Sequence, residues 1–134
     1  MRSRLVAAFV ATALMAFGAS TWAHHAHGNY ALNTVDIEGV VSEFHLLNPH
    51  SWLYIEVSHA NGQKQIWGLE AGGRGQLLKI GVTPESMKPG SKVKVRCNPL
   101  RDGTPGCLLG FVKTEDGTIR DWDGNFQTSI PKDF

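Results

Sequence analysis

The sequence predicts an all-β protein with one short helix, folded as a five-stranded barrel of the OB type. Short segments alternate apolar and polar residues, and turns are frequent, since 15 glycines and 6 prolines occur in 134 residues. The one helical stretch falls between the third and fourth expected strands, where an OB barrel has its helix. An immunoglobulin-like sandwich needs about seven strands and fits less well.

Five segments have the composition or alternation expected of strands: Val35–Phe44, Trp52–Val57, Gln65–Leu69, Lys92–Arg96 and Leu108–Lys113. Gly39 lies within the first of them and marks a bend or bulge. Asn61-Gly62 supplies a tight turn that makes the second and third a hairpin. Arg74–Ile80, after Gly72-Gly73, is expected to form one or two helical turns. The last hairpin is expected to end at Asp116-Gly117.

The chain begins with the features of a cleaved secretory signal. Arg2 and Arg4 precede the apolar run 5–17, and Thr21 and Ala23 place small residues before a cleavage point. The run is shorter than the roughly 20 residues that span a bilayer, so an uncleaved anchor is the lesser alternative. We expect a periplasmic protein without stable membrane insertion once the signal is removed.

Four parts follow from these boundaries. They are the signal peptide 1–23, a His-rich segment 24–34, the barrel 35–117 and a tail 118–134. The tail carries isolated apolar residues, Trp122, Phe126 and Ile130, which are expected to dock loosely at most.

Composition excludes several functions. A formal net charge of +1 removes the electrostatic case for nucleic acid. No G-x-S-x-G, H-E-x-x-H or P-loop motif occurs, and Gly72-Gly73-Arg74-Gly75 lacks the dinucleotide-binding spacing. A small filled barrel leaves little room for a substrate pocket, so the sequence favours a non-enzymatic role without excluding an enzyme.

The two cysteines, Cys97 and Cys107, flank the turn-rich loop 98–106. In an exported protein such a pair is more often a disulfide than a metal or redox site. We therefore predict a disulfide across the last hairpin.

The histidines carry the chemical signal. All six lie near the start of the mature chain: His24, His25, His27, His45, His50 and His59. Neutral imidazole is the commonest protein ligand for copper, zinc and nickel, and short His-rich tracts often bind metal. The alternative is a solvated chain end of no particular function.

Cleavage after Ala23 would make His24 the first residue, so that its amine and imidazole could chelate one ion together. A second imidazole is then needed, and His45 or His50 could supply it, with His25 and His27 as further candidates. Cleavage one residue earlier would place His25 third, which is another amino-terminal copper chelate. Both possibilities favour Cu(II), because all donors are nitrogen atoms.

The segment Asn48-Pro49-His50-Ser51-Trp52 joins the first two strands. Pro49 presets a turn and Asn48 can close it, whereas a turn has no need of the imidazole of His50. His59 is expected to be an ordinary exposed turn residue. Solvated outward positions are expected for five acids: Asp36, Glu38, Glu43, Glu56 and Glu70.

The chain resembles a family of small exported bacterial proteins of unknown function, in which a signal ending in Ala is followed by His-His-Ser-Phe and then N-P-H-(S/A)-W. The matching residues are Ala23-His24-His25 and Asn48–Trp52, with further likeness in Trp67–Glu70, Met87–Gly90 and Asn98–Gly103. Ala26-His27 and the two cysteines depart from the family pattern. The resemblance implies an exported OB-like barrel and no activity, and it adds weight to His24, His25 and His50.

The sequence thus favours a periplasmic metal-binding protein, copper first, that acts as a carrier, buffer or sensor. The alternative is an interaction module whose barrel face, with Trp52, Tyr54 and Trp67, receives a peptide, a saccharide or a periplasmic protein partner. A hydrolase or oxidase ranks last.

Overall fold

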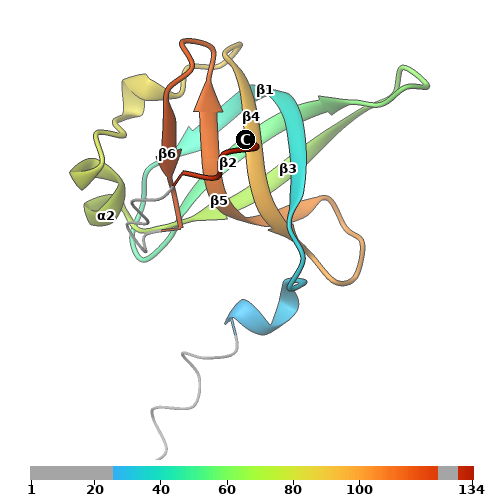
Figure 1. The fold of residues 1–134 in the computed structure, drawn as a ribbon, viewed down its shortest axis with the longest axis horizontal. Helices are drawn as coiled ribbons and strands as arrows, with labels where there is room; N and C mark the ends of the chain where they lie inside the picture. Colours follow the sequence, from blue (N-terminus) through green and yellow to red (C-terminus); the bar gives the residue numbers. More distant parts are fainter. Residues whose placement is uncertain (1–25, 124–129) are drawn as a thin grey trace, which may run out of the picture.

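The computed structural model describes residues 26–123 and 130–134, and its strands close into a barrel (Figure 1). The sheet order is β3-β2-β1-β4-β5-β6, and a parallel pairing of β3 with β5 closes it. The strands are β1 (Val35–His45), β2 (Ser51–Ser58), β3 (Lys64–Ala71), β4 (Lys92–Pro99), β5 (Gly106–Thr114) and β6 (Ile119–Asp121). The predicted five-stranded OB-like barrel is confirmed, and β6 is an additional strand.

Strand β1 changes partners near Gly39. Its first half pairs with β4, from Val35 opposite Cys97 to Val40 opposite Lys92. Its second half pairs with β2 and ends with His45 opposite Trp52. A Cβ at Gly39 would lie 2.9 Å from the carbonyl oxygen of Glu56, so glycine lets the two strands approach at the predicted bend.

In the part of the chain that the structure describes, three short helices lie outside the sheet: η1 (Ala26–Asn29), α2 (Arg74–Lys79) and η2 (Pro84–Ser86). Helix α2 follows β3, as predicted, and its Leu77 is buried in the core. The amide of Gly73 donates a hydrogen bond of 2.9 Å to Oε1 of Gln76, which fixes the first turn. No helix in the described residues is long and apolar enough to cross a membrane.

The core extends past residue 117, contrary to the expectation of a loosely docked tail. Trp122 is 1% exposed, and its ring centre lies 5.4 Å from that of Phe44. The carbonyl of Trp122 accepts a hydrogen bond of 2.7 Å from Gly72, and its amide donates one of 2.6 Å to Gly110. These bonds hold the backbone of Trp122 against the barrel, and its indole belongs to the hydrophobic core. Ile130 is largely exposed, as expected, and Phe126 lies outside the described residues.

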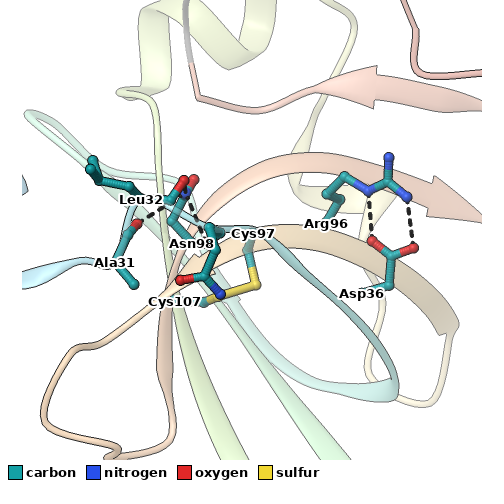
Figure 2. Close-up of a disulfide and its surroundings, with 8 residues drawn as sticks. Ala31, Leu32, Asp36, Arg96, Cys97, Asn98 and Cys107 are labelled. Carbon is teal, nitrogen blue, oxygen red and sulfur yellow. Dashed lines mark hydrogen bonds and ion pairs between the residues drawn. A yellow bond between two sulfur atoms is a disulfide. The ribbon is translucent and has the colours of Figure 1, made fainter.

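The predicted disulfide is confirmed. Cys97 and Cys107 are bonded, with their Cα atoms 5.7 Å apart, and both are buried (Figure 2). The strands on either side are longer than predicted, since β4 continues to Pro99 and β5 begins at Gly106. Next to the disulfide, Nδ2 of Asn98 donates to the carbonyl oxygen of Ala31 at 3.1 Å, which holds the chain that precedes β1.

Candidate functional site

The loop between β1 and β2 presents His50 from a fixed backbone. The carbonyl oxygen of Leu47 accepts hydrogen bonds from the amide of Arg74, at 2.8 Å, and from Oγ of Ser51, at 3.2 Å. The Asn48–Pro49 peptide bond is cis. A Cβ at Gly73 would lie 2.6 Å from the carbonyl oxygen of Pro49, so the loop packs against the start of α2. His50 is thereby held at the end of the barrel where β2 begins.

His50 lies beside a buried carboxylate. Glu70 is 8% exposed and stands opposite Trp52 in the pairing of β2 with β3. Its Oε1 contacts Nδ1 of His50, and its Oε2 accepts a hydrogen bond of 2.5 Å from the hydroxyl of Tyr30. Both carboxylate oxygens are therefore engaged. The expectation that Glu70 is solvated is wrong, because the segment that precedes β1 covers its outward position.

Tyr30 is fixed by the far end of β4. It forms an isolated antiparallel bridge with Leu100, and Nε of Arg101 donates a hydrogen bond of 2.9 Å to its carbonyl oxygen. Burial raises the pKa of the Tyr30 hydroxyl, and the hydrogen bond and negative charge of Glu70 raise it further. The hydroxyl is therefore a neutral donor at physiological pH. Its short bond to Glu70 has the length of a charge-assisted hydrogen bond.

This arrangement determines which nitrogen of His50 is available. A carboxylate only accepts hydrogen bonds, so neutral His50 donates from Nδ1 and keeps the lone pair of Nε2. The His50 side chain is 40% exposed. A carboxylate that holds one ring nitrogen is how proteins orient an imidazole for metal binding or for proton transfer. His50 can therefore act as a metal ligand or proton acceptor through Nε2.

The other histidines are distributed differently. Nε2 of His45 lies 2.9 Å from Oε2 of the exposed Glu43, and its ring contacts the edge of Tyr54. His59 lies 3.3 Å from Gln65 near the β2–β3 turn, as expected of an exposed turn residue. His27 belongs to η1, whereas His24 and His25 lie outside the described residues. Within residues 26–123 and 130–134, no three or more His, Cys, Asp or Glu side chains are grouped to hold a metal.

The three aromatic candidates do not share one face. Trp52 and Tyr54 are two residues apart on β2 and lie on the same outer face, with ring centres 6.4 Å apart and ring planes 20° from parallel. Trp67 stands opposite the buried Ile55 and packs against the core. Its Nε1 is buried and has no hydrogen-bond partner. Of these three candidates, Trp52 and Tyr54 form an outer aromatic surface, whereas Trp67 does not belong to it.

Tyr30, Glu70 and Arg101 were not singled out by the sequence as site residues. A signal for two of them existed, because Glu70 ends the segment Trp67–Glu70 and Arg101 lies in Asn98–Gly103, both of which carry the family resemblance. Glu70 contacts both Tyr30 and His50, and Arg101 contacts the backbone of Tyr30. The cluster therefore includes Tyr30, a residue of the His-rich segment 24–34. Tyr30 itself had no signal in the sequence.

The fold and this cluster define a small OB-like β-barrel with an extra strand and a histidine held by a buried carboxylate. The chain belongs to DUF6152, a family of unknown function, which matches residues 11–109. Among solved structures, the chain is similar to the mitochondrial single-stranded DNA-binding protein Rim1 of S. cerevisiae, at 17% identity and a TM-score of 0.48. That match covers 63% of this chain and 96% of Rim1. No curated protein matches the sequence.

Proposed function

We propose that this protein is an exported, periplasmic metal-binding protein, copper first, that serves as a carrier, buffer or sensor. In this proposal His50 supplies a barrel ligand through Nε2, and the His-rich start of the mature chain supplies the others. The observation that carries the proposal is the continuous contact from Tyr30 through Glu70 to His50. It attaches Tyr30, which lies in the His-rich segment 24–34, to the carboxylate that orients His50.

Chain length supports this assembly. At no more than about 3.6 Å per residue, the Cα atom of His27 lies within about 11 Å of that of Tyr30. By the same measure, the length of the intervening chain lets His25 and His24 reach no farther than about 18 and 22 Å from Tyr30. Docking of Tyr30 therefore keeps His50 within reach of these residues and reduces the entropy that a joint site would lose on binding.

The donor set favours copper. Cleavage after Ala23 would give His24 a primary amine beside its imidazole. Nε2 of His50 would add a third nitrogen ligand, and nitrogen ligands suit the square-planar coordination of Cu(II). His25 and His27 remain alternative donors, as does His45, although its Nε2 faces Glu43. None of these sites requires a thiolate, and both cysteines are joined to each other.

The decisive experiment is a Cu(II) titration of the protein purified from the periplasm, with intact mass identifying its first residue. The protein beginning at His24 is compared with one extended by a single Gly and with His50→Ala. Both changes should weaken binding much more than the matched control His59→Ala. Unchanged affinity in the extended protein and in His50→Ala would overturn the proposal.

One observation favours a second candidate, an interaction module. Trp52 and Tyr54 form a nearly parallel, partly exposed pair on the outer face of β2, and such pairs receive sugar rings or peptide side chains. Trp52→Ala and Tyr54→Ala would then abolish binding to a periplasmic saccharide or protein while leaving the copper titration unchanged. The metal-binding role alone would be favoured if His50→Ala lost copper binding while Trp52→Ala and Tyr54→Ala had no effect on partner capture.

A further inference from the structure

Residues 130–134 lie across the outer face of the barrel, where the C label overlies β4 in Figure 1. The Arg96 guanidinium makes two hydrogen bonds to Asp36, of 2.6 and 2.9 Å, and two more to Asp133, of 2.9 and 3.3 Å. Figure 2 shows the paired bonds to Asp36. One arginine thus joins the barrel and the tail segment.

The ring of Phe134 completes this contact. Two cations lie over its ring, with Nζ of Lys94 5.2 Å and the Arg96 guanidinium 5.1 Å from its centre. Its centre also lies 6.3 Å from that of Phe111. Phe111 stands opposite Arg96 in the pairing of β4 with β5, and so shares the outer face of the sheet. Phe134 therefore covers the ring of Phe111 on the outer face of the sheet.

The surface continues beyond Phe134. Nζ of Lys113 donates to the carbonyl oxygen of Phe134 at 3.5 Å. Lys94 and Lys113 also line an open groove of about 600 Å³, whose charged residues are three lysines and three glutamates: Lys92, Lys94, Lys113, Glu38, Glu56 and Glu115. The groove is therefore of mixed charge, and the positive charge that faces the tail segment comes from Lys94, Arg96 and Lys113.

We propose that this outer face of β1, β4 and β5 is a peptide-binding site for an acidic residue followed by an aromatic residue, and that residues 130–134 occupy it as an internal, displaceable ligand. The partner is a protein segment of the same chemistry. The Asp133 side chain is 77% exposed, and the contacts are a surface ion pair and surface cation–π contacts, which are weak individually. The tail segment is an intramolecular competitor of such a partner, so removing its two contacting side chains should raise the affinity of this face for a partner peptide.

The test uses the full chain in which Asp133→Asn and Phe134→Ala together vacate the surface, and a fluorescently labelled, amidated peptide Ile-Pro-Lys-Asp-Phe. Anisotropy should show the peptide binding this variant at least about tenfold more tightly than it binds the unaltered chain, because the tethered segment no longer competes. Lys132→Ala, which changes an exposed neighbour, should bind the peptide as the unaltered chain does. Adding Arg96→Gln to the vacated variant should abolish binding.

Two results would overturn the proposal. One is equal binding by the vacated and unaltered chains, and the other is equal binding of a control peptide Ile-Pro-Lys-Asn-Ala. Circular dichroism of each variant verifies that the barrel is folded. If Arg96→Gln unfolds it, Lys94→Gln replaces that variant and should weaken the binding in the same direction.

Discussion

Tyr30 and Glu70, 40 residues apart in the chain, are joined by a buried hydrogen bond of 2.5 Å. The bond connects the segment before the barrel to β3 and leaves the other carboxylate oxygen to His50. A single carboxylate therefore sets both the course of the incoming chain and the orientation of the imidazole. The first two predictions test these two effects separately.

Glu70→Gln should weaken Cu(II) binding by about 10- to 100-fold, the usual effect of losing a partner that orients a metal ligand. The amide can donate to Nδ1 of His50, which would place the proton on Nε2 and block the coordinating nitrogen. Isothermal titration calorimetry measures the affinity. Glu43→Gln, beside the exposed His45, is the matched control and should have little effect. Equal losses in the two variants would contradict a specific role for Glu70.

Tyr30→Phe should lower the free energy of unfolding by about 1.5 to 3 kcal/mol, the contribution of a hydrogen bond to a charged group. Chemical denaturation at neutral pH measures this loss. Tyr54→Phe is the control, because Tyr54 is only partly buried on the outer face of β2. A loss no larger than that of Tyr54→Phe would show that the bond to Glu70 contributes little.

Tyr30 should also make stability sensitive to alkaline pH. Its pKa is raised in the folded protein, whereas in the unfolded chain it ionises near pH 10. Its favourable contribution is therefore complete below about pH 10 and declines as the pH rises above that value, since only the unfolded state releases the proton. Denaturation between pH 8 and 11 should show a steeper decline in the unaltered protein than in Tyr30→Phe. Parallel declines would argue against a shifted Tyr30.

Low pH should destabilise the folded protein in part through protonation of Asp36. Hydrogen bonds from the Arg96 guanidinium lower the pKa of Asp36, so the ionised carboxylate is favoured in the folded protein. This contribution is present above the unfolded pKa of about 3.9 and is lost as the pH falls through the lower folded value. Asp36→Asn should therefore be less stable than the unaltered protein at pH 7, and the difference should shrink near pH 2.5. A difference that is constant with pH would contradict this account.

Trp122→Ala should lower the free energy of unfolding by about 3 to 5 kcal/mol, the range for deleting a large buried aromatic side chain. The indole packs against Phe44, and its loss would leave a cavity at the end of the barrel. Thermal and chemical denaturation measure the effect. Ile130→Ala, at a largely exposed position, is the control and should change stability little. A small loss at Trp122 would place it outside the cooperative core.

The barrel was predictable because strand alternation and turn residues are local signals. The cover over Glu70 was not, since alternation shows that a side chain points outward and cannot show which distant segment lies over it. Trp122 was missed for a related reason, because an isolated aromatic residue after a short strand has no periodicity. His50 was a candidate site residue because a turn does not require an imidazole. Its partner Glu70, in contrast, was expected to be exposed to solvent.

The change of partner along β1 also determines when the site can form. Val35 cannot find its partner until the chain is complete as far as Cys97, and Tyr30 waits for Leu100 and Arg101. Such distant pairings form late in folding, because the entropy of closing a long loop must be overcome first. The contacts of Tyr30 with Glu70 and of Glu70 with His50 therefore become complete only after Tyr30 has paired with Leu100, and a chain truncated before Leu100 would lack the bridge that holds Tyr30.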